Sequence, residues 1–328
     1  MVIDFHTHFY PEAYLEDLAR NPGVARVTRD ETGRWVVHYA GDYNIVADGH
    51  ISVEARLRDM DAAGIDVAVL SFTTPGVHVE APERGVRLAR LVNDAYAALV
   101  RGYPNRFSAL ATLPLQAPEA AADELKRAVT RLGLPGAMVF SNVNGRPLDS
   151  PEFRPLFERA ARLGVPLMVH PTTPVFGTTG VDDYRLVAIL GFLFDTTIAA
   201  CRLVFSGLFE AYPGLQLVLA HLGGALPYVA ERADRAWAVY PELRPRISRP
   251  PTAFFKNLYY DTVNFDPAAL ELALKFAGPD RLLLGSDYPH QVGDMGRAVE
   301  TVSGLAVPEE VRRAILGDNA ARLLRLKG

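Results

Sequence analysis

The sequence lacks the features typical of secreted, membrane-spanning and nucleic-acid-binding proteins. Cys201 is the only cysteine in 328 residues, so the chain can form no internal disulfide. The formal net charge of -4 provides no basic field to attract nucleic acid or anionic lipid. The most apolar long stretch, residues 186–208, is interrupted by Gly191, Asp195 and Arg202. It therefore lacks the roughly 20 consecutive apolar residues of a membrane span.

The first residues also lack a positively charged region and a long apolar run, so we expect no signal peptide. We interpret Cys201, which lies in an apolar helical pattern, as a small core residue rather than a reactive thiol. These absences predict a cytoplasmic protein whose partner is a small molecule, with no nucleic acid and no membrane. Hydrophobic residues make up 49% of the chain, enough for a substantial core.

Eight short apolar runs alternate with helical patterns along the chain. Most runs are continuously apolar, as expected for parallel strands that are buried on both faces. The runs cover residues 2–5, 66–71, 107–113, 136–140, 166–170, 216–221, 257–261 and 281–287. This order predicts an α/β fold, a (β/α)₈ TIM barrel. An open doubly wound sheet is the alternative fold, but the Gly-x-Gly-x-x-Gly that would favour it does not follow the first run.

Helical patterns separate the runs. They cover residues 52–63, 83–103, 118–132, 151–163, 183–212, 225–239, 267–276 and 295–303. Ser52 and Gly64 suit the N-cap and C-cap of the first of these helices. Residues 308–316 and 319–324 predict a C-terminal helical tail. We find no linker and expect residues 1–328 to form a single domain.

One segment interrupts this alternation. Residues 24–28 and 34–39, joined by a turn at residues 30–33, predict a small β-hairpin within an insertion at residues 10–50 after the first strand. The hairpin would rise above the C-terminal face of the barrel. It could form a lid, or it could be a peripheral excursion without a role in function.

Metal-binding residue types gather at the predicted strand ends. His6 and His8 end the first strand, His170 ends the fifth and Asp287 ends the eighth. The C-terminal ends of barrel strands meet around one cavity, and residues i and i+2 of a strand point to the same side. These four residues therefore predict one metal site. Three imidazoles and a carboxylate suit Zn²⁺, with Mn²⁺ or Fe²⁺ less favoured.

His221 ends the sixth predicted strand and precedes Leu222-Gly223-Gly224. A bound metal lowers the pKa of its water, and a neutral imidazole within reach takes or returns that proton near pH 7. We therefore predict His221 as a catalytic residue. Asp287 could act as ligand, base, or both in turn.

The remaining histidines receive structural interpretations. His290 could contact a metal ligand or a substrate, but a position in a solvated loop is favoured. His38, His50 and His78 lie in the insertion or in loops and are interpreted as structural.

Together these motifs resemble the amidohydrolase superfamily, and more narrowly its branch of decarboxylases similar to aminocarboxymuconate-semialdehyde decarboxylase (amidohydrolase 2). The resemblance runs through nearly the whole chain and rests on His6-Thr7-His8, His170-Pro171, His221-Leu222-Gly223-Gly224 and Gly285-Ser286-Asp287-Tyr288-Pro289. It implies zinc held by His6, His8, His170 and Asp287, with His221 activating the metal-bound water. It also implies a homodimer and a non-oxidative decarboxylation that needs no organic cofactor.

The chain departs from this branch at two anionic anchors. Ala47 and Tyr240 stand where the resemblance implies arginines that bind the substrate carboxylate. We therefore expect a substrate other than aminocarboxymuconate semialdehyde. Arg185 or residues of the hairpin could replace the anchors, although an exposed helix-surface position is favoured for Arg185.

The leading hypothesis is a metal-dependent decarboxylase of a small aromatic or unsaturated carboxylic acid. The alternative is an amidohydrolase, lactonase or hydratase that uses the same metal-activated water. A non-catalytic binding protein is a third hypothesis, which the complete ligand set disfavours. Aromatic and amide residues near the strand ends are candidates for the pocket wall: Phe72, Phe140, Asn142, Phe176, Tyr259 and Tyr288.

Overall fold

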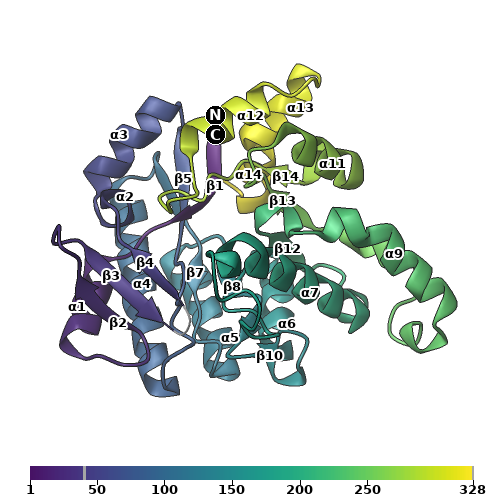
Figure 1. The fold of residues 1–328 in the computed structure, drawn as a ribbon, viewed down its shortest axis with the longest axis horizontal. Coiled ribbons are helices and arrows are strands. Elements are labelled where there is room, and N and C mark those ends of the chain that lie inside the picture. Colours follow the sequence, from purple (N-terminus) through teal and green to yellow (C-terminus); the bar gives the residue numbers. More distant parts are fainter. Residues whose placement is uncertain (40–41, 327–328) are drawn as a thin grey trace.

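The computed structural model describes residues 1–39 and 42–326, and parallel strands form its centre (Figure 1). One sheet has the order β1-β5-β6 and a second has the order β14-β13-β12-β11-β8-β7. The strands of the first sheet are β1 (Ile3–His8), β5 (Val67–Ser71) and β6 (Phe107–Ala109). Those of the second are β7 (Ala111–Thr112), β8 (Ala137–Phe140), β11 (Pro166–His170), β12 (Gln216–Leu219), β13 (Tyr259–Asp261) and β14 (Leu282–Leu283).

The two sheets meet at both edges. Only Leu110 separates β6 from β7, and its N–H donates to the Leu70 carbonyl at 2.8 Å. At the other edge, the Phe5 N–H donates to the Leu284 carbonyl at 2.8 Å and the Asp287 N–H donates to the His6 carbonyl at 2.9 Å. The strands therefore form a closed ring, and each of the eight predicted runs contributes to it. The predicted α/β fold is confirmed.

Helices cover the outside of this ring (Figure 1). Every residue of β1, β5, β8 and β11 is buried, which explains why these strands are continuously apolar or carry side chains that bond inside the fold. The α-helices that follow the strands are α3 (Val53–Ala63), α4 (Pro82–Gly102), α5 (Pro118–Arg127), α6 (Arg154–Leu163), α7 (Phe192–Phe205), α8 (Leu208–Ala211), α9 (Leu226–Val239), α10 (Thr252–Phe255), α11 (Pro267–Ala277), α12 (Met295–Ser303), α13 (Glu309–Arg313) and α14 (Asn319–Leu324).

Shorter or irregular turns connect these elements. They are η1 (Ala128–Leu132), η2 (Pro151–Phe153), η3 (Val187–Gly191), η4 (His221–Gly223), η5 (Pro241–Leu243), η6 (Pro279–Arg281) and η7 (Ala314–Asp318), together with a small pair of strands, β9 (Asn142–Val143) and β10 (Arg146–Pro147). The predicted caps of α3 are confirmed. The Ser52 hydroxyl accepts from the Ala55 N–H at 3.1 Å, and Gly64 is left-handed with φ 71°.

The long helix predicted at residues 183–212 is wrong in its extent. Tyr184 and Arg185 have φ of 54° and 59°, so the helical segment starts only after them, as η3 and then α7. Among the described residues, Val187–Phe205 is one helical segment whose length and mean hydropathy of 1.8 match a membrane span, and half of it is buried inside the fold. Cys201 packs partly buried in this helix, and burial raises the pKa of its thiol to about 11.

The predicted hairpin is confirmed as β2 (Arg26–Arg29) and β3 (Trp35–Tyr39), which pair antiparallel. The sequence pattern missed a third strand, β4 (Asp42–Ile45), that pairs with β3. It also missed α1 (Glu12–Arg20) and α2 (Asp48–Ile51). Both α2 and β4 span only four residues, which is too short for a periodic pattern to be recognised.

Candidate active site

The predicted metal ligands come from three strand ends and meet at one point. His6 and His8 lie on β1, His170 ends β11, and Asp287 follows β14. The Nε2 atoms of His6 and His8 are 3.0 Å apart. The Asp287 Oδ1 is 3.0 Å from Nε2 of His8 and 3.4 Å from Nε2 of His6. Residues that are 281 positions apart along the chain (6 and 287) therefore share one centre.

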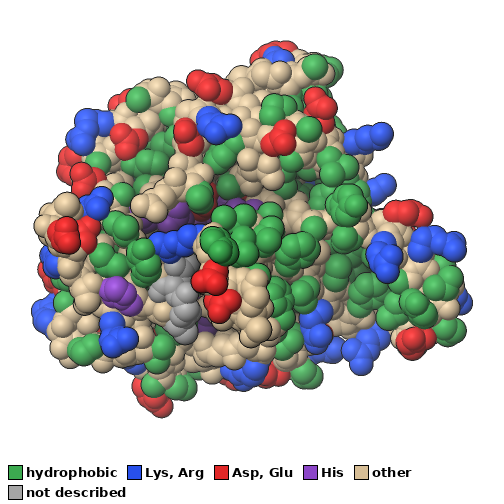
Figure 2. Space-filling view, in the orientation of Figure 1, with side chains coloured by type: hydrophobic (Ala, Val, Ile, Leu, Met, Phe, Trp, Pro, Cys, Tyr) green, Lys and Arg blue, Asp and Glu red, His purple; other side chains and the backbone are tan. Residues whose placement is uncertain are grey.

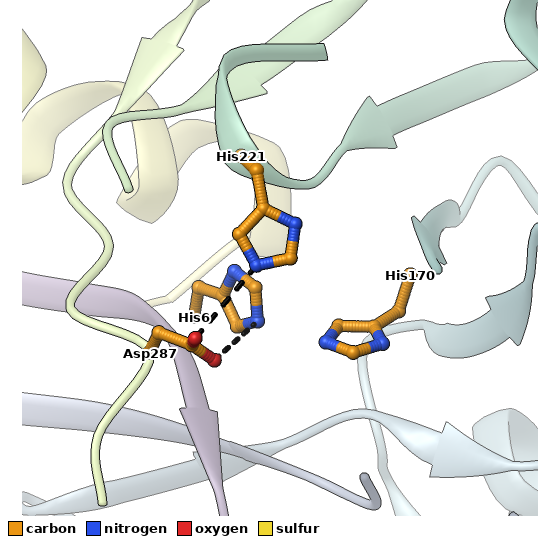
Figure 3. A group of neighbouring side chains, drawn as sticks. All are labelled: His6, His170, His221 and Asp287. Carbon is orange, nitrogen blue, oxygen red and sulfur yellow. Dashed lines mark ion pairs between the residues drawn. The ribbon is translucent and has the colours of Figure 1, made fainter. Parts of the chain in front are cut away.

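Figure 3 shows that His221 reaches the same centre from a different element. Potential ligand atoms of His6, His170, His221 and Asp287 all lie within 4.8 Å of one another. A second group, within the same limit, consists of His8, Asp287 and His290. The structure thus brings together every predicted site residue and adds His290.

Three of these imidazoles are anchored at Nδ1. His6 Nδ1 lies 2.6 Å from the Asp261 carboxylate, and His170 Nδ1 lies 2.8 Å from the Pro171 carbonyl. His8 Nδ1 lies 3.1 Å from the Ser71 hydroxyl, whose proton is donated to the Thr7 carbonyl at 2.9 Å. The Asp261 carboxylate and the Pro171 carbonyl can only accept, and the Ser71 hydroxyl donates its proton to Thr7, so in this arrangement each Nδ1 carries the proton. Each Nε2 therefore presents a lone pair to the centre.

The electrostatics of the group agree with a site for a cation. Burial lowers the pKa of His8 to about 3 and also lowers the pKa of His170, so both stay neutral, which is the form that binds metal. Burial works against ionisation of Asp287, but the neighbouring imidazoles of His221 and His8 outweigh it and lower the pKa of this carboxyl. Neutral imidazoles and an ionised carboxylate form the donor set that a divalent transition metal prefers.

Asp261 is a functional residue that the sequence analysis missed. Burial alone would lower the pKa of His6, but the neighbouring Asp261 carboxylate raises this pKa above its usual value. Asp261 is fully buried at the end of β13, and its other oxygen accepts from the N–H groups of Leu222 and Val263 at 3.3 and 3.0 Å. It therefore fixes both the His6 ring and the turn after His221. A carboxylate at a predicted strand end was the available signal, the same one that identified Asp287.

His221 differs from the other imidazoles in its support. It opens the turn η4, and both His221 and Leu222 have φ of 54°, a left-handed conformation that costs energy for residues with a Cβ. Its Nε2 lies 3.7 Å from the Asp287 Oδ2. Its Nδ1 is buried and has no hydrogen-bond partner among the described residues. This turn aims the ring at Asp287 and leaves one ring nitrogen unbonded.

A cavity of about 380 Å³ opens above this group, which is the size of a small-molecule site. Figure 2 shows purple histidine side chains in a hollow of the surface near the centre of the view. The described residues that line the cavity are Tyr39, Tyr43, Asn44, Ile45, Thr73, Thr74, His170, Arg185, Ala188, Ile189, Phe192, Leu193, His221, Val263, Asn264, Phe265, Asp287, His290, Gln291 and Val292.

Two of the predictions need correction at this cavity. The solvated loop favoured for His290 is wrong, because His290 is half-buried and its ring centroid lies 4.8 Å from that of His8. The exposed helix-surface position favoured for Arg185 is also wrong. Arg185 is exposed, but it precedes η3, lines the cavity and places its guanidinium 4.3 Å from the centre of the Tyr43 ring. Sequence alone could not show how these two loops fold back over the strand ends.

The predicted wall residues are wrong for this cavity, because its described lining contains none of Phe72, Phe140, Asn142, Phe176, Tyr259 and Tyr288. Phe72 is fully buried in the core, 4.7 Å from the Tyr14 ring. Its chain neighbour Thr73 lines the cavity instead. The direction of the side chain alternates from one residue to the next where a strand ends, and the composition does not reveal which of two neighbours faces the cavity.

The two positions without the expected arginine lie outside the main cavity. Ala47 lines a second, more open pocket together with Arg34 and Tyr288. Tyr240 is 54% exposed at the C-terminal end of α9. Neither residue offers a cation to a ligand in the main cavity.

The three histidines interpreted as structural lie outside both groups of potential ligands. His50 and His78 are buried, and His38 lies on β3 with its Nε2 2.7 Å from the Thr28 hydroxyl.

The family model of the amidohydrolases matches residues 3–326. The chain belongs to the amidohydrolase family. It is 30% identical to a 2-amino-3-carboxymuconate-6-semialdehyde decarboxylase of Dictyostelium discoideum, a match that covers 99% of this chain and 91% of that protein. The crystal structure of a 5-carboxyvanillate decarboxylase from Sphingomonas paucimobilis matches with a TM-score of 0.88 at 30% identity, covering 99% of each chain.

A third relative shows a metal in this fold. It is a dihydroxybenzoic acid decarboxylase from Polaromonas with bound manganese and the inhibitor 2-nitroresorcinol, which matches with a TM-score of 0.80 at 29% identity over 99% of this chain and 97% of that chain. These findings confirm the predicted family and its decarboxylase branch. Together with the converging donors, they confirm the prediction of a divalent metal site.

Proposed function

We propose that this chain catalyses the metal-dependent, non-oxidative decarboxylation of a small aromatic carboxylic acid. The observation that carries the proposal is the convergence of three Nε2 lone pairs and the Asp287 carboxylate at the floor of a cavity of about 380 Å³. The relatives act on carboxylic acids, and two of them act on aromatic ones. We propose a distorted (β/α)₈ barrel as the scaffold for this chemistry, with residues 1–328 forming one domain. We also propose that the protein acts in the cytoplasm.

We assign His6, His8, His170 and Asp287 as the metal ligands. The donor set suits Zn²⁺, while the manganese of the Polaromonas relative makes Mn²⁺ the main competitor. A bound divalent ion supplies Lewis-acid stabilisation of the negative charge that develops as the carbon–carbon bond breaks. The protein holds the donors in place through Asp261, Ser71 and the Pro171 carbonyl.

His221 moves the proton in the proposed reaction. The bond between the ring carbon and the carboxylate breaks, CO₂ leaves, and the electron pair stays on the ring carbon. A proton from the His221 imidazolium then takes the place of the carboxylate on that carbon, and His221 becomes a neutral imidazole. The side chain of His221 is 11% exposed and lines the cavity, so it can be reprotonated from solvent. Asp287, 3.7 Å away, orients the ring.

The three-stranded sheet β2-β3-β4 forms a lid in this proposal, since Tyr39, Tyr43, Asn44 and Ile45 line the cavity. We also propose a homodimer. Apolar side chains at the start of the α7 segment are exposed, with values of 53% for Ile189, 41% for Leu190 and 48% for Phe194. Figure 2 shows green side chains gathered beside the hollow. Light scattering should give twice the mass of the chain, and a Phe194→Asp variant should be monomeric.

The central test is CO₂ release. The purified protein should contain about one divalent ion per chain by elemental analysis, and it should release CO₂ from a hydroxybenzoate. Treatment with a chelator should abolish release, and Zn²⁺ or Mn²⁺ should restore it. Hydrolysis of a lactone or hydration of an alkene without any CO₂ release would contradict the proposal in favour of the hydrolase or hydratase alternative.

A further inference from the structure

The lining of the main cavity changes with depth. His170 and Asp287, at the proposed metal centre, are 3% and 5% exposed. Three other lining residues are open to solvent, with exposed fractions of 42% for Tyr43, 53% for Ile189 and 69% for Val292. The cavity therefore has a closed floor at the metal centre and a mouth that is bordered by hydrophobic side chains.

The three mouth residues come from separate segments of the chain. Tyr43 lies on β4 in the lid sheet, Ile189 lies on η3 after β11, and Val292 follows β14. They therefore border the opening from different sides, and Figure 2 shows hydrophobic side chains beside the hollow that contains the histidines. Single exposed apolar side chains are common on protein surfaces, but several around one opening are typical of a site that contacts an apolar ligand.

The cavity is larger than one substituted ring requires. A cavity of about 150 Å³ is enough to bind benzene, whereas this cavity has a volume of about 380 Å³. A hydroxybenzoate whose carboxylate lies at the metal centre would therefore occupy the floor and leave the mouth residues in contact with water. Covering those residues requires a ligand with a second bulky group.

Arg185 decides the chemistry of that second group. Its guanidinium lies 4.3 Å from the centre of the Tyr43 ring, and Arg185 also lines the cavity. A guanidinium is planar and weakly hydrated, and it stacks on aromatic faces. An aromatic ring in the mouth would contact both Arg185 and the apolar side chains, whereas an aliphatic group would gain only from the apolar side chains. A carboxylate would be attracted to Arg185, but it would lose water against Ile189 and Val292.

We infer that the substrate carries a second aromatic ring, which extends from the reacting ring into the mouth of the cavity and stacks on Arg185. The inference rests on the proposed decarboxylation for the reacting acid. It adds a subsite for the second ring, formed by Tyr43, Arg185, Ile189 and Val292.

The first test compares acids that share the reacting part and differ in one substituent. They are 2-hydroxybenzoate and its phenyl, cyclohexyl and carboxyl derivatives, each substituted at ring position 4 or 5. For the metal-loaded protein, a phenyl group in at least one position should raise kcat/KM for CO₂ release by about tenfold or more, the gain from burying a ring of this size. The cyclohexyl group should give a gain about two- to fivefold smaller, because it lacks the contact with the cation.

Two outcomes of this comparison overturn the inference. No gain from phenyl in either position would show that the mouth holds no second ring. A larger gain from carboxyl than from phenyl would make Arg185 an anchor for an anionic group instead.

The second test uses matched variants. Val292→Asn places a polar group in the mouth and should lower the ratio of kcat/KM between the phenyl acid and 2-hydroxybenzoate by about threefold or more. Val239→Asn is the control, because Val239 is also exposed but lies on α9, outside the described lining of the cavity. Arg185→Met keeps an apolar stem without the charge, so it should abolish the difference between phenyl and cyclohexyl. The same ratio in Val292→Asn and Val239→Asn overturns the subsite.

The proposed homodimer offers a competing explanation for the exposed mouth, since Ile189 belongs to both apolar surfaces. The monomeric variant Phe194→Asp separates the two. A ligand that covers the mouth by itself should keep the preference for the phenyl acid in the monomer. Loss of the preference in the monomer would assign the mouth to the contact between copies and overturn the inference.

This inference and the proposed function fail in distinguishable ways. If calorimetry shows tighter binding of the phenyl acid than of 2-hydroxybenzoate but neither acid releases CO₂, decarboxylation is wrong and the subsite holds. If 2-hydroxybenzoate releases CO₂ and the phenyl group improves neither binding nor kcat/KM, decarboxylation holds and the second ring is wrong.

Discussion

His6, His8, His170 and His221 surround the proposed metal centre, and these four imidazoles fall into two kinds. His6, His8 and His170 are at most 3% exposed, lie within strands, and have Nδ1 held by a hydrogen-bond partner. His221 follows its strand in a left-handed turn, is partly exposed, and has no partner for Nδ1 among the described residues. The first kind cannot turn or exchange protons easily, while the second can do both.

This difference in exposure and hydrogen bonding separates the residues that hold an ion from the residue that moves a proton. A ligand is held by hydrogen bonds that fix its tautomer, because the metal needs one lone pair in one direction. A proton carrier needs two accessible states and contact with solvent or substrate. Proximity alone would have grouped His221 with the ligands.

The largest expected effect separates the two kinds of imidazole directly. His221→Asn should lower kcat by about 10²–10⁴-fold, the contribution of a general acid, while metal content stays at the wild-type value. The matched variant His170→Asn should lose the metal together with activity. Elemental analysis and CO₂ release measured on the same preparations check both. Loss of metal in His221→Asn would show that His221 is a ligand, and the division of the imidazoles into two kinds would be wrong.

A smaller effect is expected from the groups that hold the ligands. Asp261→Asn should weaken metal affinity about 10–100-fold, because it removes the carboxylate that fixes Nδ1 of His6. Ser71→Ala removes a neutral partner of His8 and should weaken affinity less. Competition with a chromogenic chelator measures both constants. Equal metal affinities in Asp261→Asn and the wild type would show that the Asp261 carboxylate does not strengthen metal binding by His6.

The smallest expected effect lies outside the metal centre, at Asp195 on α7. Burial raises the pKa of this carboxyl, despite hydrogen bonds from Ser141, Asn142 and the Val175 N–H. The folded state therefore favours protonated Asp195, a stabilisation that is complete below the ordinary carboxyl range and is lost as pH rises through the raised pKa.

The measurement is the free energy of unfolding by urea, for metal-free wild type and Asp195→Asn, between pH 4 and pH 7. The wild type should lose its advantage over the variant as pH rises, by about 1.4 kcal/mol for each unit by which the pKa is raised. An advantage that grows with pH would show that the hydrogen bonds, rather than burial, dominate at Asp195.

The sequence predicted the site better than it predicted the cavity. His6, His8, His170 and Asp287 were identifiable because strand ends converge and metal-binding residue types are few. The wall residues were not, since Phe72 faces the core while its neighbour Thr73 lines the cavity. Asp261 was placed at a strand end but not linked to His6, because a hydrogen bond across 255 positions leaves no pattern in the sequence.

Local patterns by themselves determined the alternation of strands and helices, the hairpin of β2 and β3, the caps of α3 and the metal-binding residue types. These depend on periodicity and on residue chemistry, which are properties of neighbouring positions. Only the tertiary structure decided that His290 belongs to the site, that Arg185 lies at the cavity, and that Nδ1 of His221 has no described partner. Those outcomes depend on how loops from distant strands fold over the same ring, and on which polar groups then meet in the space between them.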